Sequence, residues 1–343
     1  MRQKFEALFA RFICALPKGL IRLMVGPAVT VNGKTLDPYV QFILEISPPQ
    51  FGDQLTPEHL RFDIEQSGPM LAPKPDRSIE TTELIIQGGG HDVPALFIAP
   101  KKLIDRVTPV LVYFHGGGHV AGSPKSHHGI CSKIASYAKC KVISIDYRMA
   151  PEHVFPAGIE DCIAAYDYVV DHAENFRIDA RKIIIGGDSA GGNIAAILAQ
   201  QLKDHDQPPC LQMLWVPWVD LAHFHPSIST FGKGYLLDET LIQWFIDLYI
   251  PADVDKKDPR ISPLYGVVEG VCPAIISTAA FDPLRDEGMA YASKLAEAGV
   301  SVDATCYEGL PHPMLNLSGH VKSAKAAFEQ SLDKMVNFLE KTP

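Results

Sequence analysis

Short apolar runs recur along the chain from about residue 109 onward. They occupy residues 109–114, 140–145, 182–186, 274–278 and 301–307. Runs of this kind are typical of strands that are buried on both faces of a parallel sheet. Helix-like spacing of apolar residues separates them, at residues 129–138, 158–172, 192–203 and 286–298. The alternation predicts βαβ units and an α/β fold, with a mostly parallel central sheet flanked by helices.

The first part of the chain has a different pattern. Residues 83–86 and 95–98 are apolar runs on either side of a glycine turn at residues 88–90, which predicts a β-hairpin. Further upstream, residues 48–49 and 69–75 are rich in proline and are interpreted as loop and linker. We therefore expect an N-terminal helical segment over residues 1–75 and a main domain over residues 76–343.

One stretch interrupts the alternation of strands and helices. Over residues 220–260, apolar and aromatic side chains recur at helical spacing, as at Leu241, Trp244, Phe245 and Leu248, and no strand pattern is present. The pattern predicts a helical insertion above the C-terminal edge of the sheet, where open α/β sheets bind ligands. Such an insertion is either an ordinary pair of surface helices or a cap over a bound substrate, shared with the N-terminal helices.

Composition narrows the class of protein. The chain has 343 residues, 47% of them hydrophobic, and a net charge of -9. This balance indicates a globular protein and argues against a nucleic-acid partner, because phosphate binding needs clustered lysine and arginine. The seven cysteines are scattered, without a CxxC pair. That spacing favours neither disulfides nor a structural metal site, and it is typical of a reduced, cytoplasmic compartment.

The N-terminus combines apolar and basic residues. Arg11, Lys18 and Arg22 interrupt an apolar stretch over residues 2–25, so no run is long enough to predict a membrane span. Arg11 lies inside what would be the core of a signal peptide, which argues against one. We interpret the stretch as an amphipathic helix broken near Pro17, packed on the fold. The alternative is peripheral contact with a membrane surface.

The strongest chemical signal is a strand, a sharp turn and a helix around Ser189. Residues 183–194 read IIIGGDSAGGNI, so that Gly187-x-Ser189-x-Gly191 fits a nucleophile elbow. This turn lifts the serine hydroxyl above the sheet edge, and the flanking glycines avoid collisions with neighbouring elements. No Lys-Ser or Lys-Thr follows the glycines and no GxGxxG is present at this turn, so the motifs for nucleotide binding are not met.

A second signal directly follows the strand at residues 109–114. Residues 115–118 read HGGG, and a glycine run leaves backbone N–H groups uncovered. A tetrahedral intermediate needs such donors where its oxyanion forms. We expect the oxyanion donors to be Gly116, Gly117 and Ala190, the residue after the nucleophile. His115 is interpreted as a structural group that braces the loop.

A serine nucleophile needs a base, and the chain order in this kind of fold is serine, acid, histidine. His312 follows the last predicted strand, where the base belongs, whereas His205, His223, His225 and His320 lie in a helix end, in the insertion or beyond the loop. The acid should follow the preceding strand, which selects Asp282. Asp286 and Glu287 also follow it, but they begin the next helix and are interpreted as helix-start carboxylates.

With these residues, the chain resembles the hormone-sensitive lipase-like esterases (bacterial family IV) of the α/β-hydrolase superfamily. The resemblance runs from about residue 110 to the end and rests on the HGGG, DYRMAPEHVFPA, GDSAGG and DPLRDE motifs. It implies an α/β-hydrolase catalytic domain with a helical cap, no metal or organic cofactor, and hydrolysis of carboxylic esters. Members usually prefer short to medium acyl chains, and many are homodimers.

Two departures from the family pattern concern the substrate pocket. His119 stands after the triple glycine, where an aromatic residue is common, and Pro313 and Met314 follow His312. We expect these three residues to shape the pocket wall near the acyl group. Two other functions remain as alternatives, an amidase or deacetylase acting on aryl amides and a non-catalytic small-molecule receptor. The presence of all three of Ser189, Asp282 and His312 disfavours the receptor.

Overall fold

The computed structural model describes residues 9, 12–46, 55–88 and 90–342. Within these residues, eight strands form one sheet in the order β10-β9-β8-β7-β5-β6-β4-β3. The strands are β3 (Ile79–Gly88), β4 (His91–Pro100), β5 (Thr108–Phe114), β6 (Lys141–Ile145), β7 (Ile178–Asp188), β8 (Leu211–Trp215), β9 (Ala274–Phe281) and β10 (Val302–Pro311). The strands from β5 to β10 pair in parallel, whereas β4 pairs antiparallel with both β3 and β6. The predicted hairpin and the mostly parallel sheet are confirmed.

The sequence pattern does not predict β8. Its apolar run contains Gln212, which breaks the continuity of the pattern, and it lies between Pro209 and Pro217. In the structure Gln212 is fully buried, and its side-chain amide donates to the carbonyl oxygen of Cys272 at 3.0 Å. A long-range hydrogen bond therefore satisfies the amide nitrogen of a residue that local patterning marks as unsuited to a buried strand.

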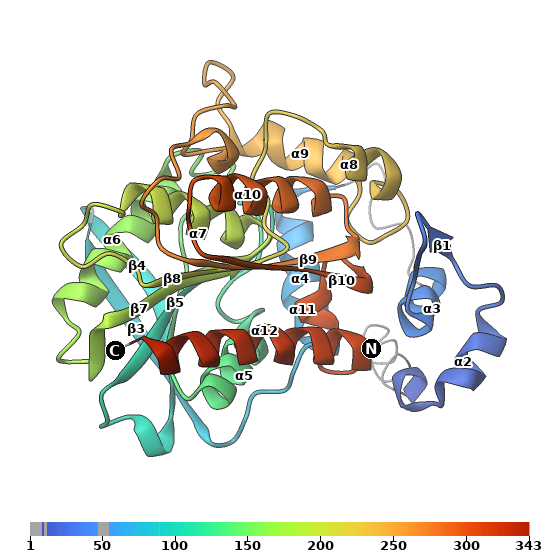
Figure 1. Ribbon diagram of the computed structural model, residues 1–343, viewed down its shortest axis with the longest axis horizontal. Coiled ribbons are helices and arrows are strands. Elements are labelled where there is room, and N and C mark those ends of the chain that lie inside the picture. Colours follow the sequence, from blue (N-terminus) through green and yellow to red (C-terminus); the bar gives the residue numbers. More distant parts are fainter. Residues whose placement is uncertain (1–8, 10–11, 47–54, 89, 343) are drawn as a thin grey trace.

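Helices cover both faces of the sheet (Figure 1). On one face lie α5 (His128–Ala138) and α12 (Lys322–Lys341), and on the other lie α6 (Ala157–Asp171), α7 (Ala190–Gln201) and α10 (Arg285–Glu297). Successive side chains of a strand point to opposite faces. Accordingly Leu111 and Tyr113 belong to one hydrophobic core, and Val112 and Phe114 belong to the other.

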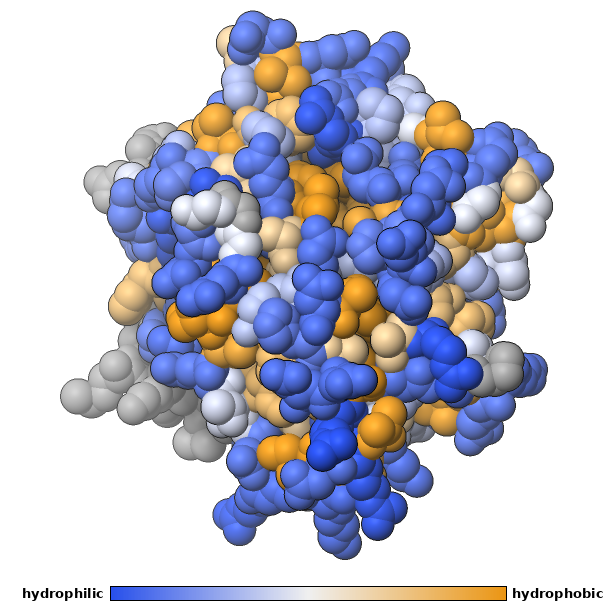
Figure 2. All heavy atoms as spheres, turned by 90° about the vertical axis from the view of Figure 1, so that its left-hand side faces the viewer, coloured by the Kyte–Doolittle hydropathy of each residue, from blue (hydrophilic) through white to orange (hydrophobic). Residues whose placement is uncertain are grey.

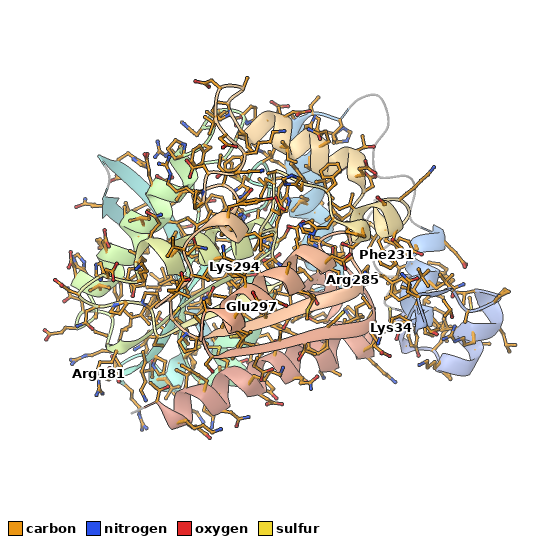
Figure 3. All side chains as sticks on the ribbon, turned by 45° about the horizontal axis from the view of Figure 1, so that its top comes forward. Lys34, Arg181, Phe231, Arg285, Lys294 and Glu297 are labelled. Carbon is orange, nitrogen blue, oxygen red and sulfur yellow. The ribbon has the colours of Figure 1, made fainter. Side chains whose placement is uncertain are left out.

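The N-terminal segment packs at the β10 end of the sheet (Figure 1). It contains α2 (Lys18–Met24), a two-stranded sheet of β1 (Thr30–Val31) and β2 (Lys34–Thr35), and α3 (Pro38–Ile46). The backbone N–H of Asp37 donates to the carbonyl oxygen of Gly309 at 3.0 Å, and Lys34 forms an ion pair with Glu308 (Figure 3). Residues 12–15 are helical and α2 begins after Pro17, so the predicted break at Pro17 is confirmed.

The proline-rich segment upstream of the hairpin is only partly a linker. Residues 48–49 lie outside the described residues, but Pro69 lies inside α4 (Pro57–Leu71), where a linker was predicted. The helix begins after Thr56, whose hydroxyl accepts from the backbone N–H of His59 at 3.2 Å. A proline near the C-terminal end of a helix removes one backbone hydrogen bond, and here the helix continues past it for two residues.

The insertion after β8 folds as helices, as its pattern predicts. Here α8 (Pro226–Phe231) and α9 (Glu239–Tyr249) follow one another, and Asp238 caps α9 by accepting from the backbone N–H of Leu241 at 2.8 Å. The guanidinium of Arg285, at the start of α10, lies 5.2 Å from the centre of the Phe231 ring (Figure 3). Shorter elements complete the fold: η1 (Lys101–Leu103), η2 (Pro263–Tyr265) and α11 (Met314–Leu317).

The face that carries α6 and the β3 edge of the sheet is largely hydrophilic, with hydrophobic residues in small separate groups (Figure 2). Glu80 and Glu83 are exposed on β3, and charged side chains on an edge strand oppose pairing with another chain. Among the described residues, no helix is both long and apolar enough to cross a lipid bilayer.

A buried ion pair joins the end of β6 to α6. The side chain of Asp161 is 1% exposed, and it accepts from the guanidinium of Arg148 at 2.7 Å and from the backbone N–H of the same residue at 2.8 Å. Nε2 of His91 also lies 2.7 Å from Oδ1 of Asp161, so Arg148 is one of two side chains that compensate this carboxylate. Removing the only partner of a fully buried charge costs about 3–5 kcal/mol.

We expect Arg148→Met to lower the free energy of unfolding by about 2 kcal/mol, below the fully buried range because the Arg148 side chain is partly exposed. Urea denaturation followed by circular dichroism measures the change. Arg181→Met is the matched control, since Arg181 pairs with Asp179 at the surface (Figure 3), and it should leave the midpoint almost unchanged. Equal midpoints for the two variants would contradict the assigned role of the Arg148–Asp161 pair.

Candidate active site

Ser189 lies at the turn between β7 and α7. Its backbone has φ 57° and ψ -119°, a left-handed conformation that is unfavourable for a residue other than glycine. A Cβ atom at Gly187 would lie 2.2 Å from the carbonyl oxygen of Phe114, and one at Gly191 would lie 1.9 Å from the same oxygen. Both positions therefore require glycine, which is the steric reason for the Gly-x-Ser-x-Gly pattern.

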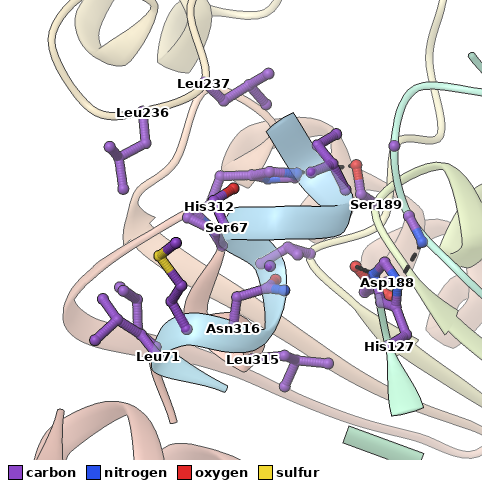
Figure 4. Close-up of a pocket in the computed structure, with 18 of the residues that line it drawn as sticks. Ser67, Leu71, His127, Asp188, Ser189, Leu236, Leu237, His312, Leu315 and Asn316 are labelled. Atoms are coloured by element: carbon purple, nitrogen blue, oxygen red, sulfur yellow. Dashed lines mark hydrogen bonds and ion pairs between the residues drawn. The ribbon is translucent and has the colours of Figure 1, made fainter. Parts of the chain in front are cut away.

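The structure brings Ser189, His312 and Asp282 into one hydrogen-bonded chain. The Ser189 Oγ lies 2.9 Å from Nε2 of His312 (Figure 4). Nδ1 of His312 lies 3.0 Å from both carboxylate oxygens of Asp282. Asp282 directly follows β9 and His312 directly follows β10, so the carboxyl ends of adjacent parallel strands bring them together. Asp282 is fully buried and also accepts from the backbone N–H of Leu284 at 2.9 Å.

The other candidate bases and acids have different partners. His225 lies 2.9 Å from Asp220, His223 lies 2.6 Å from the hydroxyl of Tyr265, and His205 lies 3.5 Å from Asp167. Asp286 pairs with Arg285 at 2.7 Å. Glu287 accepts from the backbone N–H groups of residues 219 and 220, at 2.7 and 3.0 Å. None of these contacts is made with His312.

The glycine loop differs from the expectation at Gly116. The Gly116 N–H donates to Oδ1 of Asp188 at 3.2 Å, so it is engaged within the protein. Gly117 and Gly118 both have left-handed backbones, with φ of 125° and 66°. Among the described residues, the N–H groups of Gly117, Gly118 and Ala190 donate to no other group. The unengaged donors of this region are therefore at 117, 118 and 190 rather than at 116, 117 and 190.

His115 braces the loop from behind, as the sequence suggests. Its Nδ1 lies 2.9 Å from the carbonyl oxygen of Gly116, its ring stacks on Tyr147 with centroids 4.4 Å apart, and the Tyr147 hydroxyl donates to its carbonyl oxygen at 2.7 Å. Burial, together with the nearby charge of His127, lowers the pKa of His115 to about 3. The imidazole is therefore neutral and structural.

A buried pair of side chains beside Ser189 has no signal in the sequence. Nε2 of His127 lies 3.5 Å from Oδ2 of Asp188, and both side chains are at least nine-tenths buried (Figure 4). Burial alone would raise the pKa of Asp188, but His127 and a hydrogen bond from Tyr113 outweigh it and hold this pKa below its usual value. Burial likewise opposes the charge of His127, yet Asp188 raises the pKa of His127 above its usual value. Each group therefore favours the charged form of the other.

A cavity of about 500 Å³ opens beside Ser189 (Figure 4). Its walls come from the N-terminal segment, α4, the glycine loop, the insertion before and within α9, and the segment that follows β10. Representative apolar lining residues are Ile43, Ile64, Leu71, Leu237, Leu241, Phe245, Leu315 and Leu317. The contribution of α4 agrees with the interpretation of the insertion as a cap that is shared with the N-terminal helices.

Of the three residues expected to shape the pocket wall, only one is in contact with the cavity. Pro313 lines the cavity, whereas His119 and Met314 lie behind its wall and are at least 98% buried. His119 stacks on Tyr249 with centroids 4.0 Å apart, and burial lowers the pKa of His119 to about 3. The left-handed backbone of His119, with φ 61°, accompanies this inward position.

Within the described ranges, no group of three or more histidine, cysteine, aspartate or glutamate side chains is arranged to hold a metal ion.

Comparison with known proteins agrees with this geometry. A family model described as alpha/beta hydrolase fold matches residues 111–316. The chain is 38% identical over 311 residues to carboxylic ester hydrolase LipN of Mycobacterium tuberculosis, covering 86% of this chain and 81% of that protein. It is 35% identical over 275 residues to ethyl acetate hydrolase of Pseudomonas putida, covering 79% and 86%.

Solved structures give the same result. A hyperthermophilic esterase from the archaeon Pyrobaculum calidifontis superposes with a TM-score of 0.83 at 32% identity, covering 89% of this chain and 99% of that one. The chain therefore belongs to the α/β-hydrolase fold family and, within it, to the hormone-sensitive lipase-like carboxylic ester hydrolases.

Proposed function

We propose that the protein hydrolyses short- to medium-chain carboxylic esters through an acyl-enzyme on Ser189. The observation that carries the proposal is the continuous hydrogen-bonded chain from Ser189 through His312 to Asp282, with the serine hydroxyl at the wall of an apolar cavity. A hydroxyl is a weak nucleophile until a base takes its proton, and His312 Nε2 lies within reach of that proton.

The reaction has two halves. In the first, His312 takes the proton of Ser189 while the Oγ attacks the ester carbonyl carbon, and the protonated histidine then gives that proton to the departing alcohol. In the second, His312 takes a proton from water, the hydroxide attacks the acyl-enzyme, and the carboxylic acid leaves as Ser189 regains its proton. The buried carboxylate of Asp282 holds Nδ1 and stabilises the charged imidazole in both halves.

The oxyanion is stabilised by backbone donors. We assign this role to the N–H groups of Gly117, Gly118 and Ala190, because the Gly116 N–H is engaged with Asp188. The N-terminus of α7 adds its partial positive charge at the same place. Each donor of this kind lowers the barrier by about 2.7–4 kcal/mol.

The cavity walls support the proposed division of the chain. We assign residues 1–75 and the insertion over about 220–260 to a helical cap, and the remainder of residues 76–343 to the catalytic domain. Both cap segments supply apolar side chains to the cavity, for example Ile64 and Leu71 from α4 and Leu237 and Phe245 from the insertion. Such walls favour uncharged acyl and alkyl groups over charged ones.

We expect Ser189→Ala to lower ester hydrolysis by at least about 10⁴-fold, because the acyl-enzyme cannot form without the hydroxyl. The measurements are release of p-nitrophenol from p-nitrophenyl butyrate and covalent labelling by a fluorophosphonate probe, and both should be lost. Ser331→Ala, which removes another buried serine hydroxyl far from the cavity walls, is the matched control and should keep the labelling. Labelling of the Ser189→Ala protein would reject the assignment.

The α4 wall predicts a limit on acyl length. Ser67 lies on α4 and lines the cavity (Figure 4), so Ser67→Trp should fill space that a longer acyl chain uses. If two methylene groups of the acyl chain lose their apolar contact, binding of the longer ester weakens by about 1.6 kcal/mol. The kcat/KM ratio of p-nitrophenyl octanoate to p-nitrophenyl acetate should then fall about 15-fold. Gln66→Trp is the matched control, since residue 66 is exposed and does not line the cavity, and its ratio should match the parent. An unchanged ratio in Ser67→Trp would exclude α4 from the acyl site.

We further propose that α2 and the residues before it contact an anionic lipid surface. The helix buries only Ile21, whereas Leu20, Leu23 and Met24 are 44%, 83% and 48% exposed. Residues 7–36 contain four basic residues and no acidic one, in a chain whose net charge is -9. Apolar side chains beside basic ones are the combination that binds the surface of an anionic membrane. Phe9 and Ile46, exposed near this surface, also line the cavity.

Sedimentation with vesicles tests this contact. The full-length protein should bind vesicles of phosphatidylcholine with phosphatidylglycerol and should bind pure phosphatidylcholine at least about tenfold less, because the basic residues interact with anionic headgroups. The double variant Leu20→Glu with Leu23→Glu should lose binding but keep hydrolysis of p-nitrophenyl acetate. Val267→Glu replaces an equally exposed apolar residue elsewhere and should bind normally. If the parent protein does not bind vesicles but forms a dimer that the double variant cannot form, this surface contacts a second copy of the chain and not a membrane.

A further inference from the structure

A cluster of ionisable side chains lies beneath the glycine loop. Asp188 is 7% exposed, His127 is 4% exposed and Tyr113 is fully buried. Oδ1 of Asp188 accepts from the Gly116 N–H at 3.2 Å and from the Tyr113 hydroxyl, while its Oδ2 faces His127 Nε2 at 3.5 Å. The other ring nitrogen of His127 lies 3.2 Å from the carbonyl oxygen of Ser123. Each polar atom of the carboxylate therefore has a partner.

The carboxylate of Asp188 lies close to the place where the oxyanion forms in the proposed mechanism. Asp188 immediately precedes Ser189, and His127, Asp188 and Gly117 all line the same cavity. Charges interact strongly in a poorly solvated site, so an uncompensated carboxylate there would oppose formation of an oxyanion. Asp188 cannot simply be regarded as inert, because its Oδ1 holds the loop that carries the proposed donors.

We propose that His127 is a positioning residue that acts through Asp188: its positive charge compensates the carboxylate, so that Asp188 holds the glycine loop by Gly116 without repelling the oxyanion. The inference rests on the proposed function, because it concerns the same intermediate. His127 transfers no proton and touches no reacting atom. Its contribution is to the charge balance and geometry of the oxyanion site.

The groups around His127 are consistent with this role. Asp188 faces it from the end of β7, Tyr113 and His115 face it from β5 and the loop that follows, and Glu65 faces it from α4. His115 is neutral because burial lowers its pKa to about 3. The two carboxylates, of which Asp188 is the nearer, therefore set the charge of His127, and the pKa of His127 is raised.

Two isosteric variants and their combination test the proposal. His127→Gln keeps a polar side chain but leaves Asp188 charged and uncompensated, so kcat for p-nitrophenyl butyrate should fall about 30-fold with KM within about twofold of the parent. Asp188→Asn keeps an oxygen for Gly116 and removes the charge, so its loss of kcat should be only about threefold. In the Asp188→Asn background, His127→Gln should cost less than about threefold further, because no charge remains to be compensated.

The pH profile supplies a second readout that a merely structural role would not move. A histidine with a raised pKa keeps its charge below that pKa and loses it as the pH rises through it. In the parent, kcat should therefore decline on the alkaline side as His127 loses its proton and Asp188 is left uncompensated. In Asp188→Asn this alkaline decline should be absent. His128→Gln is the matched control, since His128 is next in sequence but contacts Thr81 instead, and it should keep the parent profile.

The outcomes separate this inference from the proposed function. Fluorophosphonate labelling reports Ser189 and should persist in every variant. If the parent protein is labelled and hydrolyses esters, but His127→Gln lowers kcat by the same factor in the parent and in the Asp188→Asn background, His127 acts by packing. The inference is then overturned while the proposed function stands. If His127→Gln does not fold, as judged by thermal melting, the Asp188→Asn profile decides alone, and an unchanged alkaline decline overturns the inference.

Discussion

A single close approach of two backbones determines how the active site is built. The carbonyl oxygen of Phe114, at the end of β5, occupies space that a Cβ at either Gly187 or Gly191 would need. Because residues 115–118 follow Phe114 directly, this approach also places the glycine loop beside Ser189. A second close contact also holds the glycine loop against the turn that carries Ser189, since a Cβ at Gly116 would lie 2.4 Å from Oδ2 of Asp188. Two segments about 70 residues apart thus behave as one rigid unit.

The parallel sheet brings Asp282 and His312 to Ser189 without another strained turn. Adjacent strands β9 and β10 end at the same edge as β7, so Asp282 and His312 need only follow their strands to reach Ser189. The strands form the centre of the buried core, whereas the apolar walls of the cavity come mainly from helices and loops packed around it. Chemistry and substrate fit are therefore carried by different parts of the chain, and a change in the walls leaves the reacting groups where they are.

Much of this arrangement could be predicted from local patterns. The apolar runs predict most of the parallel strands, and the short motifs predict the positions of Ser189, Asp282 and His312, because each motif sits at the end of a predicted strand. The features that escaped prediction depend on distant contacts. Gln212 is acceptable in β8 only because Cys272 accepts its hydrogen bond. The engagement of Gly116 and the His127–Asp188 pair depend on residues 61 or more positions apart, for which no spacing rule exists.

The attachment of the N-terminal segment to β10 has a consequence for synthesis on the ribosome. Asp37 contacts Gly309 and Ser323, and Lys34 pairs with Glu308. An early part of the described chain therefore packs against residues that are synthesised near the end. His312 is also made more than 100 residues after Ser189. A nascent chain that has already exposed Ser189 therefore lacks both the proposed base and the cavity wall that follows β10. Hydrolytic capacity arises in one late step, when the final strand joins the sheet.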